Sequence, residues 1–162
     1  MDTDKHIIFR LKEQTFAVHV QQIVSIERAL SLTEVPRTPG FLKGVTEMRG
    51  VMTPIIDLRE RLELGGVEIT DQTRTLVVQV EDMQIGMVVD QATEVKDIPA
   101  SFIKPAPKLV GEINDTFLLG VATIDDELIL LLDLEQIIQF TEKNQLKEII
   151  NDIDESGKSM ES

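Results

Sequence analysis

The fold is decided by two stretches with the same pattern, residues 7–27 (IIFRLKEQTFAVHVQQIVSIE) and residues 76–96 (LVVQVEDMQIGMVVDQATEVK). At an offset of 69 the two stretches share eight apolar positions: Ile7/Leu76, Ile8/Val77, Phe9/Val78, Leu11/Val80, Phe16/Ile85, Val18/Met87, Val20/Val89 and Ile26/Val95. Few residues are identical, so the similarity lies in the order of apolar and polar positions. Such self-similarity predicts that one structural unit is present twice.

The repeat continues beyond these stretches, with an offset that changes. The offset of 69 also pairs Pro36 with Pro105, whereas an offset of 76 pairs Gly44/Gly120, Val45/Val121, Asp57/Asp133 and Leu58/Leu134. The second copy therefore has seven more residues between Pro105 and Gly120.

Each copy is predicted to consist mainly of strands. Phe16, Val18 and Val20 alternate with other residues, which is typical of a half-buried strand. The polar runs at residues 12–14 and 81–84 occupy equivalent places and predict hairpin turns. Residues 51–56 and 128–132 predict well-buried strands. Pro54 has no amide hydrogen, so its strand is expected at an edge or with this nitrogen facing away from the ladder.

An aspartate followed by helical residues ends each of these buried strands. Asp57-Leu-Arg-Glu60 and Asp133-Leu-Glu-Gln136 both have the spacing of a capping box. The Asp57 and Asp133 carboxylates are therefore expected to be structural caps of short helices, each worth about 1 kcal/mol. Gly65-Gly66 is then expected to end the first helix, and residues 65–75 are expected to form a polar linker.

The predicted fold is a mainly β domain over residues 1–140. It is divided into a first β unit at residues 7–64 and a second at residues 76–140, and an exchange of strands between the units is left open. Leu146, Ile149, Ile150 and Ile153 recur at helical spacing. Residues 141–162 are therefore expected to form a C-terminal helix and tail.

The composition disfavours several classes of function. Sixteen Lys and Arg against 29 Asp and Glu give a net charge of −13, which disfavours nucleic acid and anionic membrane surfaces as partners. The absence of Trp and Tyr further disfavours base stacking. The chain has no cysteine, no signal-peptide pattern and no apolar run long enough for membrane insertion. A cytoplasmic protein is expected.

The sequence contains few residues in patterns typical of catalytic or metal-binding sites. His6 and His19 lie in no zinc-binding pattern and are expected at the surface. Asp57, Asp90 and Asp133 permit one alternative, a carboxylate site for hydrolysis or metal binding. Because Asp57 and Asp133 are equivalent in the two copies, capping explains them better than catalysis. No enzyme activity, cofactor or metal ion is expected.

One stretch is not explained by packing, Gly40-Phe-Leu-Lys-Gly-Val-Thr-Glu-Met-Arg49-Gly50. It places polar and charged residues between two apolar strands, with glycine at both ends. Arg49-Gly50 is expected at a hairpin tip, and the equivalent Asp125-Asp126 has no arginine. A feature present in one copy only is less readily required by the fold, so this stretch is the candidate functional segment.

The run GVTEMRGVMTPIIDLR, residues 44–59, resembles the signature of the CheW family of bacterial chemotaxis adaptors. That family's pattern is approximately GVxNLRGxxxPxxDLR, and the shared positions are Gly44, Val45, Arg49, Gly50, Pro54, Asp57, Leu58 and Arg59. Residues 85–90 (IGMVVD) and 128–138 (LILLLDLEQII) are also similar to the family. The resemblance thus covers about residues 7–140.

The resemblance implies two small five-stranded SH3-like β-barrels side by side. It also implies a non-catalytic adaptor that couples the cytoplasmic signalling tip of methyl-accepting chemoreceptors to the regulatory domain of the histidine kinase CheA. Recruitment to membrane-associated receptor arrays and ring assembly with CheA are further expectations. Exposed apolar strand ends are the expected kinase-docking surface.

In the family, receptor binding and signal coupling are associated with the segment that matches Ile23, Gly44, Thr46 and Arg49. Glu47, Met48 and Gly50 complete the candidate partner-binding residues. Glu47 stands where the family usually has asparagine, and Met48 stands where it usually has leucine. Glu47 adds a charge and removes a hydrogen-bond donor, so a different receptor preference or affinity is expected.

The sequence also permits alternative functions. An isolated CheW-like domain of a CheV or CheA type protein fits the same motifs, although only 22 residues follow Phe140, too few for the receiver domain of a complete CheV. A β-barrel enzyme that uses the aspartates and a nucleic-acid-binding barrel are alternatives from different classes.

Overall fold

The computed structural model describes residues 4–28, 40–110 and 113–138, and it is mainly β. The first copy provides β1 (Lys5–Leu11), β2 (Gln14–His19), β3 (Ile23–Glu27), β4 (Leu42–Met48) and β5 (Val51–Asp57). The second copy provides β6 (Arg74–Val80), β7 (Met83–Val89), β8 (Gln91–Asp97), β9 (Leu109–Val110), β10 (Ile113–Asn114), β11 (Leu118–Ile124) and β12 (Glu127–Leu132).

The helical elements are short. Helix α1 (Leu58–Arg61) follows β5, and helix α2 (Leu134–Ile137) follows β12. Three 3₁₀ turns lie at Val20–Gln22, Ala100–Phe102 and Asp115–Phe117. None of the helices in the described part of the chain has the length and apolar character of a membrane span. The expected C-terminal helix at residues 141–162 lies outside the described residues.

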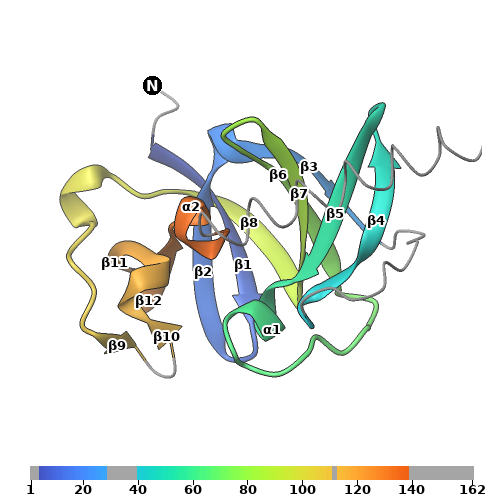
Figure 1. Ribbon diagram of the computed structural model, residues 1–162. Helices are drawn as coiled ribbons and strands as arrows, with labels where there is room; N and C mark the ends of the chain where they lie inside the picture. Colours follow the sequence, from blue (N-terminus) through green and yellow to red (C-terminus); the bar gives the residue numbers. More distant parts are fainter. Residues whose placement is uncertain (1–3, 29–39, 111–112, 139–162) are drawn as a thin grey trace, which may run out of the picture.

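Two five-stranded sheets lie side by side, which confirms the predicted fold class (Figure 1). We call β11-β12-β2-β1-β8 sheet I and β3-β6-β7-β5-β4 sheet II. Each copy contributes its first hairpin to the sheet built by the other copy. The hairpin β1–β2 completes sheet I, and the hairpin β6–β7 completes sheet II. The sheets therefore do not coincide with the two repeated stretches of sequence.

Each donated hairpin joins its sheet through a parallel strand pair. In sheet I, Ile129–Leu131 of β12 pair with Thr15–Ala17 of β2. In sheet II, Ile55–Asp57 of β5 pair with Gly86–Val88 of β7. Strand β5 thus lies inside its sheet and not at an edge. Its pairing with β7 begins one residue after Pro54, so the missing amide hydrogen lies beyond this ladder.

The main apolar core lies between the sheets, because one face of each sheet contributes to the same cluster of buried residues. Sheet I supplies Phe9 and Phe16, whose rings stack with centroids 5.7 Å apart. Sheet II supplies Leu76, Val78, Ile85 and Met87 to the same cluster. Burial of a side chain of this size stabilises the fold by about 1.5–3 kcal/mol. The association of the two sheets is therefore part of folding.

A smaller core fills sheet I on its other face. It consists of six buried residues, Ile8, Ala17, Ile98, Ala122, Ile129 and Leu131. The chain that follows β8 returns to the opposite edge of this sheet, where Lys104 and Val121 exchange two backbone hydrogen bonds of 2.8 Å. These bonds close sheet I around its core.

A glycine lies at a register shift at the same place in both sheets. The shift falls between Leu118 and Gly120 in β11 and between Leu42 and Gly44 in β4. A Cβ atom on Gly120 would lie 2.6 Å from the Lys104 carbonyl oxygen, so this close backbone approach requires glycine. The equivalence of Gly44 and Gly120 shows that this bulge is a property of the repeated unit.

Arg61 connects equivalent parts of the two copies. Its guanidinium group lies 5.5 Å from the ring centroid of Phe41 and 4.9 Å from that of Phe117, and these two residues are related by the offset of 76. Its Nε donates a hydrogen bond of 2.6 Å to the carbonyl oxygen of Ile137, the equivalent of Arg61 itself. One cation therefore contacts equivalent parts of both copies.

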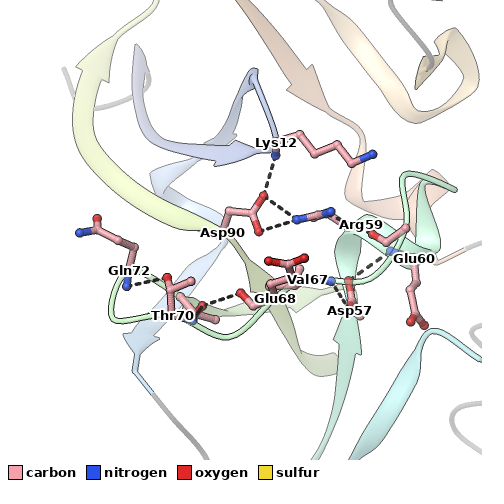
Figure 2. A network of polar contacts seen from close by, with 11 residues as sticks. Lys12, Asp57, Arg59, Glu60, Val67, Glu68, Thr70, Gln72 and Asp90 are labelled. Atoms are coloured by element: carbon pink, nitrogen blue, oxygen red, sulfur yellow. Dashed lines mark hydrogen bonds and ion pairs between the residues drawn. The ribbon is translucent and has the colours of Figure 1, made fainter.

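Asp57 and Asp133 lie at the N-termini of α1 and α2. The Asp57 carboxylate accepts hydrogen bonds from the amides of Glu60 (3.1 Å) and Val67 (2.8 Å), as Figure 2 shows. Asp133 Oδ1 accepts from the amides of Glu135 (3.1 Å) and Gln136 (3.4 Å). Asp57 thus holds the linker after its helix as well as the helix itself.

Asp90 lies where the chain passes from sheet II to sheet I, and its carboxylate joins elements of both (Figure 2). Arg59 Nη1 of α1 donates to its two oxygens at 3.0 and 3.2 Å. The Lys12 amide in the β1–β2 turn donates to Asp90 Oδ2 at 2.6 Å. This half-buried ion pair connects α1, the crossover and a hairpin turn of sheet I.

His6 is buried, so its expected place at the surface is wrong. It pairs across the strands with His19, and the two rings make an edge contact with centroids 5.1 Å apart. Burial is the main cause that lowers the pKa of His6, and the neighbouring His19 lowers it further. A hydrogen bond of 2.7 Å with the Asp4 carbonyl oxygen acts in the opposite direction.

Removing the two caps is expected to have unequal effects. Asp57→Ala leaves two partly buried amides without an acceptor and should lower the free energy of unfolding by about 2 kcal/mol, whereas Asp133→Ala should cost about 1 kcal/mol at its more exposed site. Urea unfolding of both variants measures the difference. An equal loss would show that the contact with Val67 contributes nothing.

The pKa of His6 makes stability dependent on pH. The pKa of His6 is lower in the folded protein than its unfolded value of 6.5. The folded state therefore binds fewer protons than the unfolded state as the pH falls through that value. The contribution of His6 to the free energy of unfolding should therefore be fully present above pH 6.5 and decrease as the pH falls below it. Urea unfolding at pH about 7.5 and about 5.5 tests this, and His6→Gln should remove this part of the decrease.

Candidate functional site

The β4–β5 hairpin carries the candidate functional segment, and its tip is a two-residue loop. Met48 and Val51 are the last cross-strand pair before the loop, which consists of Arg49 and Gly50. Both loop residues have left-handed backbone conformations, with φ values of 54° and 77°. Such two-residue loops are typical of tight β-hairpins. Arg49 and Gly50 are both exposed, so the Arg49 side chain is accessible to a partner.

The second copy has the same loop with different chemistry. Asp125 and Asp126 connect β11 to β12 with φ values of 51° and 67°. Aspartate adopts this left-handed conformation more readily than most residues, whereas arginine has no such preference. The left-handed loop is therefore required by the hairpin, but the positive charge at Arg49 is not.

The other candidate residues on this hairpin differ in exposure. In β4, Thr46 and Met48 are half-buried and Glu47 is exposed beside the tip. Gly44 is buried at the bulge that both copies share, so it shapes the strand. The exposed chemistry of the segment is thus concentrated at Glu47, Arg49 and Gly50.

Ile23 lies apart from these residues in the order of strands. It begins β3, the edge strand opposite β4 in sheet II, and it pairs with Val78 of β6. Its half-buried side chain packs against the core between the sheets. The structure thus brings Gly44, Thr46, Glu47, Met48, Arg49 and Gly50 together on one hairpin and places Ile23 on the other edge strand.

Gln84 belongs to this site, although the sequence predicts a turn over residues 81–84. Only Glu81 and Asp82 lie between β6 and β7, and Gln84 lies within β7, where the residue is 9% exposed. Its Nε2 donates to Thr53 Oγ1 of β5 at 2.8 Å and to the Met48 carbonyl oxygen at 3.2 Å. A polar residue within the otherwise apolar run MQIGMVV was the available signal.

The aspartates of the enzyme alternative are engaged in structural contacts. Asp57 and Asp133 accept backbone amides, and Asp90 binds Arg59 and the Lys12 amide. Within residues 4–28, 40–110 and 113–138, no group of three or more His, Asp or Glu side chains is arranged to hold a metal ion. The geometry of these residues fits support of the backbone.

Exposed aliphatic side chains mark the outer strands of both sheets. Ile26 on β3 is 42% exposed and Val95 on β8 is 52% exposed. The offset of 69 relates these two residues, and both strands are edges of their sheets. Edge strands with exposed apolar residues are suited to contact with another protein.

Comparisons with known proteins agree with this architecture. Residues 5–142 match the family model of the CheW-like domain. The chain is 34% identical over 135 residues to the chemotaxis protein CheW of Bacillus subtilis, which covers 83% of the chain and 86% of that protein. It is 35% identical over 133 residues to protein FrzA of Myxococcus xanthus, which covers 81% of the chain and 82% of that protein.

A solved structure shares the fold. The crystal structure of the scaffolding protein TtCheW from Thermoanaerobacter tengcongensis matches with a TM-score of 0.79 and 27% sequence identity, covering 86% of this chain and 90% of that one. One conclusion follows from the two sheets with exchanged hairpins, the signature on the β4–β5 hairpin and these similarities. This chain belongs to the CheW family of chemotaxis scaffold proteins.

Proposed function

We propose that this protein is a non-catalytic adaptor that couples the cytoplasmic signalling tip of chemoreceptors to the regulatory domain of the histidine kinase CheA. Membership of the CheW family supports the general role in chemotaxis. The adaptor would act in the cytoplasm at membrane-associated receptor arrays. Its residues contribute binding surfaces, and the aspartates serve the fold.

One observation carries the assignment of the receptor contact. Arg49 and Asp125 occupy equivalent loops with nearly the same φ, yet they carry opposite charges. Packing and backbone geometry therefore do not select arginine at this tip. An exposed cation at a hairpin tip, on a protein with a net charge of −13, is suited to an acidic or carbonyl-rich patch on a partner.

The residues beside Arg49 complete the proposed surface. Glu47 is exposed two positions before the tip, so it sets the charge next to Arg49. Thr46 and Met48 are half-buried and fix the strand below it, and Gly50 permits the second left-handed residue. Gly44 contributes through the bulge in β4. Ile23 borders the core from the opposite edge of sheet II.

The proposed kinase contact uses the outer strands. Ile26 and Val95 present exposed apolar area at equivalent positions on β3 and β8. Because the two edges belong to different sheets, the adaptor would offer two similar docking surfaces. Head-to-tail association through such surfaces closes into rings when the rotation allows it. This arrangement supports ring assembly with CheA.

Reversing the charge at the tip should abolish coupling without unfolding the protein. Arg49→Glu is expected to keep the unfolding free energy within about 0.5 kcal/mol, because the side chain is exposed. It should remove receptor-dependent activation of CheA in a reconstituted assay of receptor, kinase and adaptor. Lys12→Glu is the matched control, since Lys12 is also an exposed cation at a hairpin loop, with φ of 55°. Activation that persists in Arg49→Glu would contradict the proposed receptor contact.

A neutral substitution separates stability from function at the same position. Asparagine tolerates the left-handed conformation, so Arg49→Asn should leave the free energy of unfolding unchanged or raise it by up to about 1 kcal/mol. Receptor-fragment binding, measured by titration calorimetry, should nevertheless weaken. If Arg49→Asn bound as tightly as the unsubstituted protein, the arginine side chain would have no part in recognition.

A further inference from the structure

Gln84 connects to both sides of the Arg49–Gly50 loop. Its Nε2 donates directly to the carbonyl oxygen of Met48, the residue before the loop, at 3.2 Å. It also donates to Thr53 Oγ1 at 2.8 Å, and this hydroxyl donates in turn to the carbonyl oxygen of Val51, the residue after the loop, at 3.0 Å. One buried amide group on β7 thus holds both residues that close the tip.

These side-chain bonds stand where sheet II lacks backbone pairing. In sheet I the parallel ladder begins with Ile129 and Thr15. Their equivalents in sheet II are Thr53 and Gln84, which are not paired in the backbone, since the ladder there begins at Ile55 and Gly86. Pro54 between them has no amide hydrogen to donate. The side-chain hydrogen bonds of Gln84 therefore continue the contact between β7 and the β4–β5 hairpin toward its tip.

The same position has a different target in sheet I. Thr15 Oγ1 donates to the side chain of Glu127 at 3.1 Å, and Arg10 also pairs with that carboxylate at 3.2 Å. Glu127 follows the Asp125–Asp126 loop. The side-chain hydrogen bonds thus end on a carboxylate in sheet I, whereas in sheet II they end on the main-chain carbonyls of Met48 and Val51, on either side of the Arg49–Gly50 loop.

We propose that Gln84 is a positioning residue that, together with Thr53, holds the Arg49–Gly50 loop in the conformation that binds the receptor. An arginine in a left-handed conformation costs free energy, so the loop depends on support from outside the hairpin. Both N–H groups of the Gln84 amide are used for this support, and Gln84 itself is too buried to touch a partner. The inference rests on the proposed function of Arg49.

The test is Gln84→Met, which keeps the length of the side chain and removes its donors. Nitrogen-15 relaxation should show increased mobility of the amides of residues 49–51 in a protein that remains folded. Affinity for a receptor signalling fragment, measured by titration calorimetry, should fall about threefold to tenfold, because a smaller fraction of loops is competent to bind. Affinity for the CheA regulatory domain should stay unchanged.

Three further variants separate positioning from a loss of stability. Thr53→Val removes the hydroxyl partner of the Gln84 amide and should have the same effect, without adding to that of Gln84→Met in the double variant. Thr53→Ser keeps the hydroxyl and should retain receptor affinity. Thr15→Val is the matched control in sheet I and should leave receptor affinity unchanged even if it lowers the free energy of unfolding.

Measuring Arg49→Glu in the same experiment distinguishes the two proposals. If Arg49→Glu loses receptor binding while Gln84→Met and Thr53→Val retain both affinity and loop order, the positioning role is wrong and the receptor contact stands. A mobile loop with unchanged affinity overturns the positioning role equally. If Arg49→Glu binds normally, the proposed receptor contact is wrong, and the inference about Gln84 falls with it.

Discussion

The packing of one sheet against the other is the interaction on which the rest of the structure depends. Aromatic and aliphatic residues of both sheets fill one continuous core, so neither sheet alone can bury the apolar face that it contributes to this core. The exchanged hairpins add a second constraint. Because β1–β2 completes sheet I and β6–β7 completes sheet II, each sheet requires strands from both copies. Folding of the two halves is therefore coupled through packing and through strand pairing.

This coupled scaffold explains which features the two copies share. Both have a bulge glycine at the start of a strand, an aspartate at the end of the next strand, and a left-handed two-residue loop between these strands. These features satisfy backbone requirements that occur twice. The loops then differ in charge, with Arg49 on one and two aspartates on the other. The charge of this hairpin tip is thus independent of the backbone requirements that the two copies share.

Much of the fold follows from local patterns in the sequence. The alternation of Phe16 and Val18 indicates a strand, and the spacing of Asp57 and Asp133 places them before short helices, because both signals depend only on neighbouring residues. The exchange of hairpins depends on contacts between distant residues, so the repeat alone left it open. Burial of His6 has the same origin, since the distant strand β8 pairs with β1 and makes it an inner strand of sheet I.

The candidate site was partly accessible from sequence. The position of Arg49 at a tip follows from the glycine beside it and the apolar strands around it. A polar residue within an apolar run marks Gln84, but its role could not be predicted, because its hydrogen-bond partner Thr53 is 31 residues away in sequence. Pro54 shows the same limit: its strand lies inside the sheet, and only the register with β7 explains how a proline is tolerated there.

The most direct test of this account is a titration of the nitrogen-15-labelled protein with an unlabelled receptor signalling fragment, followed by amide chemical shifts. The account predicts that the shifts change at residues 46–50 of the β4–β5 hairpin and remain unchanged at the equivalent Asp125–Asp126 loop. Changes centred on Asp125–Asp126, or at neither loop, would contradict it.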